Sequence, residues 1–243
     1  MKKKIFLTIL ASGLLCITGC GGESQDNGDG ENTVTAPEGL TYKVIEDADG
    51  NVYEGYVNAE GLYEGYGVMQ YADSTLYEGT WEAGVWEGSA EITWNSGCIY
   101  VGETHAGAMH GIGYMIWPMG DYYIGEWENG NPNGAGTKYF MIDSTAENTR
   151  TKYNIYTGDM ENGLKVGHGV MRYTSGALYD GEWINDVRSG HGVVYWESGL
   201  EWIKFEGEFA NDWISGEGTM YYADGRVVKG VFEGTELVEE ISE

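Results

Sequence analysis

An aromatic-x-Gly motif recurs along this chain at intervals of 23 to 33 residues, and no other feature restricts the fold as strongly. A period in this range is typical of proteins built from stacked repeats, in which each unit contacts only its neighbours. The successive motifs are Tyr53/Gly55, Tyr77/Gly79, Tyr100/Gly102, Tyr123/Gly125, Tyr156/Gly158, Tyr179/Gly181, Phe205/Gly207 and, in a degenerate form, Val228/Gly230. The sequence therefore predicts a repeat array over most of its length.

Each unit carries a second glycine signal eleven or twelve residues after its aromatic residue. The pairs are Gly65/Gly67, Gly88/Ala90, Gly111/Gly113, Gly134/Gly136, Gly167/Gly169, Gly190/Gly192 and Gly216/Gly218. A turn such as Asn129-Gly130 or Asn185-Asp186 lies between the two signals, and one such as Ser175-Gly176 separates the units. These residues supply the positive φ angles of tight hairpins. With 40 glycines and three prolines in 243 residues, the units should be pairs of short antiparallel strands, not helices.

Alternation along the strands places rings and glycines on one face of the sheet. In one unit Tyr179, Gly181 and Trp183 share this face, and a ring from the neighbouring strand should cover the bare backbone of the glycines. The position two residues after the second glycine is apolar in six units of seven, with Lys138 as the exception. We expect these columns to form the core of the repeat array, and a ligand site built by the same rings is the less favoured interpretation. The candidate repeat-face aromatics, with a structural or a binding role, are Trp81, Trp127, Trp183 and Phe209.

This layout resembles the MORN repeat, whose unit runs Tyr-x-Gly-x-Trp, a turn, Gly-x-Gly and a closing aromatic residue. The units that begin at Tyr123 and Tyr179 follow the pattern best, and the resemblance spans roughly residues 40–234. It implies an all-β fold, an elongated antiparallel sheet of stacked β-hairpins. It also implies a role in protein association or in placing partners at membranes.

The chain is strongly acidic, with 39 aspartates and glutamates, 13 lysines and arginines, and a formal net charge of −26. Nucleic acids and anionic lipid headgroups require clustered basic residues, so neither is an expected partner. The expected partner is an envelope protein with basic patches, and weak binding of divalent cations stays an alternative. An acidic stripe should face away from the rings, formed by Glu54, Glu78, Glu103, Glu126, Asp159, Glu182, Glu206 and Glu208.

The first twenty residues have the organisation of a bacterial secretory signal. Three lysines precede an apolar run, residues 5–17, that is too short for a comfortable bilayer span. Ile17-Thr18-Gly19-Cys20 resembles the lipobox of bacterial lipoproteins, which implies that Cys20 is diacylated and becomes the N-terminus after cleavage. We therefore expect a signal peptide at 1–19, a flexible acidic tether at 20–39, and the repeats at 40–234. The expected location is the extracytoplasmic face of a cell membrane, with the lipid anchor as the membrane contact.

Two segments depart from the repeat. The fourth unit carries ten extra residues within Asp143–Asn154, which predicts a surface loop or a longer hairpin. For the final segment, residues 235–243, the sequence predicts either a short helix that caps the last repeat or an acidic disordered tail.

No residue pattern in the sequence points to catalysis, a metal or a cofactor. His110, His168 and His191 lie beside the glycine pairs, where a structural or surface role is expected, and His105 lies in a hairpin turn. The chain has no nucleophile elbow, phosphate loop or zinc-ligand spacing, so an enzyme is not expected. Two functions remain: a protein-binding scaffold at the bacterial cell envelope, or a wall- or glycan-binding module that uses exposed aromatic rings.

Overall fold

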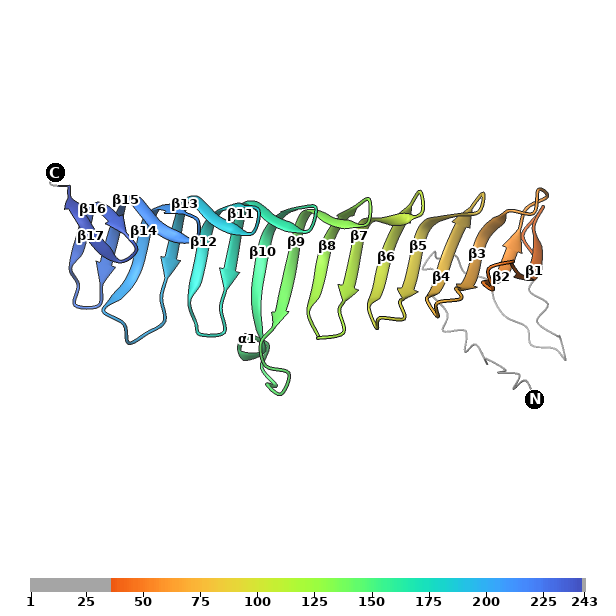
Figure 1. Cartoon of the computed structure of the whole chain (residues 1–243), viewed down its shortest axis with the longest axis horizontal. Coiled ribbons are helices and arrows are strands. Elements are labelled where there is room, and N and C mark those ends of the chain that lie inside the picture. Colours follow the sequence, from red (N-terminus) through yellow and green to blue (C-terminus); the bar gives the residue numbers. More distant parts are fainter. Residues whose placement is uncertain (1–35, 242–243) are drawn as a thin grey trace, which may run out of the picture. The chain divides into compact units, whose positions relative to one another are not determined.

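The computed structural model describes residues 36–241, which form one antiparallel sheet of seventeen strands in chain order (Figure 1). This confirms the predicted all-β sheet of stacked hairpins, whereas the predicted signal peptide, Cys20 and most of the tether lie outside the described residues. One short helix, α1, spans Thr149–Lys152. The strands are β1 Thr41–Glu46, β2 Val52–Val57, β3 Tyr63–Gln70, β4 Leu76–Glu82, β5 Val85–Thr93, β6 Ile99–His105, β7 Ala108–Ile116, β8 Tyr122–Glu128, β9 Asn131–Met141, β10 Tyr153–Glu161, β11 Leu164–Arg172, β12 Leu178–Ile184, β13 Val187–Tyr195, β14 Trp202–Ala210, β15 Trp213–Tyr222, β16 Val227–Glu233 and β17 Glu236–Glu240.

Two-residue turns join the paired strands of most units, as the sequence predicts. Asn129-Gly130 connects β8 to β9 with φ angles of 49° and 82°, and Asn185-Asp186 connects β12 to β13 with 48° and 72°. Positive φ at both central residues is the geometry whose twist matches that of paired strands. These turns fix the register of each hairpin.

In most units the first aromatic ring covers two glycines. Tyr179 is completely buried, and a Cβ atom added to Gly192 would lie 2.5 Å from its hydroxyl oxygen. A Cβ added to Gly181, which pairs with Gly192 across the hairpin, would lie 2.6 Å from the same oxygen. The prediction of a ring from the neighbouring strand is therefore confirmed for Gly192 but incomplete, because the ring also covers the glycine two residues later in its own strand.

A β-bulge follows the first glycine of the unit and explains why the motif needs two further glycines. Between Gly181 and Trp183 the register shifts, and the Tyr179 hydroxyl donates a 3.0 Å hydrogen bond to the carbonyl oxygen of Glu182. Opposite the bulge, Gly190 adopts a φ of 71°, a backbone conformation that is strained for residues with a side chain. Bulges bend strands, and the hairpins curl over along one long edge of the sheet (Figure 1).

Replacing Tyr179 with phenylalanine should lower the free energy of unfolding by about 1 kcal/mol. The variant loses one hydrogen bond of ordinary strength but keeps the ring over the glycines. Phe205 shows that a ring without a hydroxyl is sufficient, since it is completely buried over Gly207 and Gly218. Urea unfolding measures the difference. Tyr179→Ala is the matched comparison and should cost about 3–5 kcal/mol; equal losses in the two variants would contradict a dominant role for the ring.

The ten-residue insertion forms a longer hairpin, as predicted. Strands β9 and β10 pair up to Met141 and Tyr153, and the connection between them contains α1. The single helical turn has no signal in the sequence pattern. In Figure 1 this connection projects from one edge of the sheet.

The C-terminal prediction is wrong in both of its forms. Residues 236–240 are neither a helix nor an irregular tail but the strand β17, which pairs with β16 after a turn at Gly234. A helix of one or two turns is unstable in isolation because few hydrogen bonds offset its nucleation cost. The open edge of β16 instead offers unpaired backbone groups, so the last residues extend the sheet.

Candidate functional site

The four aromatic residues predicted as candidates are buried between repeats. Trp81, Trp127, Trp183 and Phe209 are 3–5 % exposed. Each packs edge-on against the tyrosine of the preceding unit, as Trp183 does against Tyr156 with ring centres 5.5 Å apart. The Trp183 indole nitrogen also donates a 3.0 Å hydrogen bond to the carbonyl oxygen of Gly169. These contacts join neighbouring hairpins and leave little ring surface for a ligand.

The closing aromatic residues of the units are more accessible. They are half-buried and pack against the fully buried rings, so they lie on the same side of the sheet. We call this side the aromatic face. Its half-buried rings are Tyr71, Trp94, Trp117, Phe140, Tyr173, Trp196 and Tyr222.

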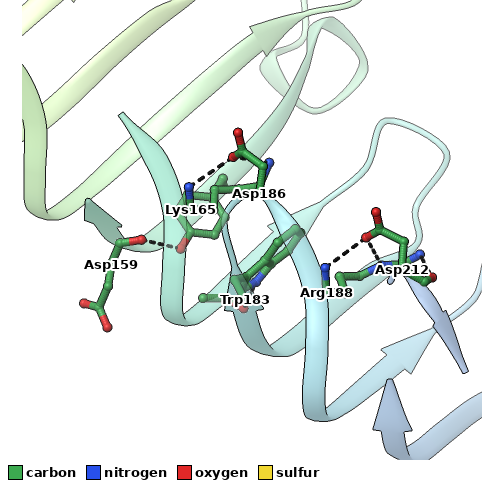
Figure 2. Close-up of polar contacts among 8 residues, drawn as sticks. Asp159, Lys165, Trp183, Asp186, Arg188 and Asp212 are labelled. Carbon is green, nitrogen blue, oxygen red and sulfur yellow. Dashed lines mark hydrogen bonds and ion pairs between the residues drawn. The ribbon is translucent and has the colours of Figure 1, made fainter. Parts of the chain in front are cut away.

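Basic side chains lie among these rings in the middle of the array, which the sequence analysis did not predict. Lys165 in β11 lies over Trp183, with its ammonium nitrogen 4.9 Å from the ring centre (Figure 2). Arg188 in β13 lies over Tyr179, with its guanidinium carbon 5.4 Å from the ring centre. Lys138 in β9 lies over Phe140 at 5.2 Å. Three cations thus lie among the rings of one face of an acidic protein.

Two of these cations are held by aspartates from the turn of the next hairpin. Asp186 accepts hydrogen bonds of 3.0 Å from both the ammonium group and the backbone nitrogen of Lys165. Asp212 accepts them from the Arg188 guanidinium at 3.2 Å and from the Arg188 backbone nitrogen at 3.0 Å (Figure 2). Burial opposes ionisation of Asp186, but the hydrogen bonds and charge of Lys165 hold its pKa below the ordinary value.

The sequence carried a signal for these pairs. Where four other units have glycine at the second position of this turn, these two have Asp186 and Asp212, which adopt φ angles of 72° and 70°. A non-glycine residue in this region is strained. The ion pairs to Lys165 and Arg188 offset that strain, but they join residues 21 and 24 positions apart, so local pattern alone did not reveal them.

An apolar hollow opens beside Arg188 near the C-terminal repeats. It has a volume of about 320 Å³ and is lined by Arg188, Val194, Trp196, Phe209, Trp213 and Ile214. Trp213 lies at its rim with 71 % of its surface exposed, although most large aromatic residues of the sheet are covered. A tryptophan exposed beside an apolar hollow is typical of a binding surface.

The predicted acidic stripe lies on the opposite side, and several of its members serve the bulge. The Glu103 carboxylate accepts a 3.2 Å hydrogen bond from the backbone nitrogen of Ile112, and Glu126 accepts one of 3.3 Å from Ala135. Negative charge in this column therefore has a structural use as well as an electrostatic one.

The two histidines that form ion pairs in the described structure, His105 and His168, lie on the surface and pair with different carboxylates. His105 pairs with Glu87 and His168 with Asp180, each at 3.0 Å, and both histidines are more than 60 % exposed. Within the described part of the chain, no group of three or more potential metal ligands occurs. Over residues 36–241, no helix has the length and apolar character needed to cross a membrane.

An open sheet of repeated hairpins, most of them with an aromatic ring over paired glycines, defines a class of β-repeat proteins. The sequence pattern of the MORN repeat matches more than half of the chain, at residues 53–76, 77–99, 100–122, 123–142, 156–178, 179–201 and 205–225. This chain belongs to the MORN repeat family. MORN repeat proteins are generally non-catalytic scaffolds whose repeats mediate interactions with proteins and membranes.

Comparison with other proteins adds little beyond the family. Among solved structures, the chain is similar to the TCP domain of SAS-4 from Drosophila melanogaster, in complex with a proline-rich motif of Ana2. The identity is 13 %, the match covers 86 % of this chain and 99 % of that chain, and the TM-score is 0.31. No curated protein matches this chain.

Proposed function

We propose that this chain is a non-catalytic scaffold that binds a partner protein on its aromatic face. The observation that carries this proposal is the apolar hollow of about 320 Å³ with Trp213 exposed at its rim. Tryptophan anchors in desolvated pockets contribute a large share of the binding energy at protein interfaces. The sheet is held together by contacts between adjacent hairpins, so the face offers a partner a preformed surface.

The binding experiment compares two exposed residues. The full chain, its Trp213→Ala variant and its Met119→Ala variant serve as baits against envelope protein and purified cell wall in parallel. Met119 is 86 % exposed and lies in a turn away from the hollow, so it is the matched control. Loss of a captured protein with Trp213→Ala alone supports the scaffold. Capture of wall that survives high salt and is competed by sugar supports the glycan-binding alternative instead.

The net charge supports a partner with basic patches. A charge of −26 creates a negative potential that attracts basic surfaces and repels anionic lipids. Binding to such a partner should weaken as salt is added. We propose no contact with nucleic acid, no cofactor, and contact with the membrane through the lipid anchor alone, while divalent cations bind weakly to the acidic surface.

We further propose that the scaffold is a lipoprotein on the extracytoplasmic face of a bacterial membrane, attached through Cys20. The support is the order of lysines, short apolar run and lipobox-like residues in the sequence. Two acyl chains on one cysteine suffice for stable membrane attachment.

Cys20→Ser should abolish acylation, so that the protein either moves from the detergent phase to the aqueous phase in detergent phase partitioning or accumulates as an unprocessed precursor. Serine lacks the sulfur to which the acyl chain is attached, so the anchor is lost. The matched control is Cys98→Ser, because Cys98 is a free cysteine of the folded sheet and this variant should stay in the detergent phase. A Cys20→Ser variant that is processed and still partitions with detergent would rule out the lipoprotein assignment.

A further inference from the structure

Lys138 occupies a column that is apolar in every other unit. The equivalent residues are all buried in the sheet, and they are Met69, Ile92, Met115, Met171, Val194 and Met220. The fold therefore needs only apolar volume at this position. A lysine here adds a charge that the architecture of the repeat does not require.

The surroundings of Lys138 contain rings, and among the described residues no carboxylate lies within ion-pair distance of its ammonium group. Its ammonium nitrogen lies 5.6 Å from the centre of the Trp117 ring and 5.2 Å from that of Phe140. Across residues 36–241, no carboxylate forms an ion pair with it. Burial lowers the pKa of Lys138, as expected for a cation removed from water. Ring faces offset only part of the desolvation of an ammonium group.

The aspartates whose charge reaches Lys138 are engaged elsewhere. Asp186 pairs with Lys165 at 3.0 Å, and Asp121 accepts a 2.7 Å hydrogen bond from the backbone nitrogen of Met141. The positive charge of Lys165 also acts on Lys138 and opposes its protonation. One positive charge on the aromatic face thus remains without a carboxylate partner.

This local charge has the opposite sign to the field of the whole chain. A carboxylate that approaches the protein is repelled by a net charge of −26 at most positions. Lys138 provides a position where a carboxylate is attracted, with apolar rings on its flanks. An attractive charge pair at one point of an interface, surrounded by positions that repel the same charge, fixes the register of the partner and makes binding specific.

We propose that the aromatic face binds a peptide segment of a partner protein through an aspartate or glutamate side chain that pairs with Lys138 beside Trp117 and Phe140. This inference rests on the proposed scaffold function and adds the chemistry of the partner at one point of the face. The inference is compatible with a partner that carries basic patches, because Lys138 would bind only one acidic side chain of that partner.

The test selects random peptides from a display library on the purified full chain and measures their affinity for three variants. Lys138→Met places the residue found at this position in four other units, so the variant should fold normally. Lys138→Arg keeps the charge. Lys43→Met removes an equal charge from the exposed strand β1 and is the matched control.

The selected peptides should share an acidic residue between apolar residues and should bind Lys138→Met at least about tenfold more weakly, with Lys138→Arg and Lys43→Met close to the native affinity. Changing the acidic residue of the peptide to its amide should weaken binding to the native chain by the same factor. The same change should not weaken binding to the Lys138→Met variant any further. Peptides that bind the aromatic face without an acid, or bind Lys138→Met equally, would overturn this inference and leave the scaffold proposal standing.

Three further outcomes would overturn it in other ways. A library that yields no binding peptide would count against both proposals. Binding of alginate that depends on Lys138, in the absence of peptide binding, would assign the carboxylate to a polysaccharide. Self-association of the full chain that Lys138→Met abolishes, measured by sedimentation equilibrium, would assign it to a second copy.

Discussion

Replacing Gly192 with valine should lower the free energy of unfolding by about 2–3 kcal/mol. The new Cβ atom would lie 2.5–2.8 Å from three atoms of the Tyr179 ring, which is completely buried and has no space to retreat. Overpacking of this kind forces side chains off their preferred rotamers and shifts the backbone. Urea unfolding followed by intrinsic fluorescence measures the loss.

Two variants control for this prediction. Ser198→Val adds the same branched side chain in an exposed turn and should change the free energy of unfolding by less than about 0.5 kcal/mol. Gly192→Ala should cost less than valine, because Ala90 occupies the equivalent position opposite Gly79 in another unit. Equal unfolding midpoints for Gly192→Val and Ser198→Val would show that the paired glycines are not contact sites for the ring.

The sheet should unfold cooperatively as the pH rises from about 10 to about 12. Burial raises the pKa of Tyr53, Tyr77, Tyr123 and Tyr179 to about 12, and it also raises the pKa of Tyr100 and Tyr156. An unfolded tyrosine ionises near pH 10. A raised pKa means that the native state favours the neutral phenol, so its contribution is complete below pH 10 and is lost as the pH approaches 12.

Parallel titrations followed by phenolate absorbance and far-ultraviolet circular dichroism test this prediction. The absorbance change from the buried tyrosines should coincide with the change in circular dichroism, because a phenolate has no proton to donate to the backbone carbonyl oxygen, such as that of Glu182 for Tyr179. Tyrosines that all ionise near pH 10 while the sheet signal stays constant would contradict it. Tyr179→Phe provides a matched variant, which should lose stability less steeply with pH because it has one such phenol fewer.

The hairpins could be predicted from sequence because their determinants are local. Asn129-Gly130 specifies a turn within two residues. The spacing of two between Tyr179, Gly181 and Trp183 predicts that they lie on the same side of the sheet. The C-terminal strand could not be predicted in the same way. Its formation depends on the hydrogen-bonding edge that β16 presents, which is a property of the assembled sheet and not of residues 236–240.

The candidate site was less accessible to sequence reasoning than the fold. The column of rings was predicted to lie on the core side of the sheet, and Trp81 and Trp127 are buried there as contacts between repeats. Lys138 was visible as a break in an apolar column, although its isolation from carboxylates required the structure. The pairing of Lys165 with Asp186 joins neighbouring repeats, so only the three-dimensional arrangement reveals it.

The strand β17 forms one edge of the described sheet. Among residues 36–241 it pairs with β16 alone, so its other side presents backbone donors and acceptors that no described strand uses. Such an edge invites another chain to continue the sheet and is a common starting point for fibres. Three of its five residues are glutamates, and all five are exposed. Like charges repel each other, so the three glutamates disfavour pairing of this edge with the same edge of a second copy.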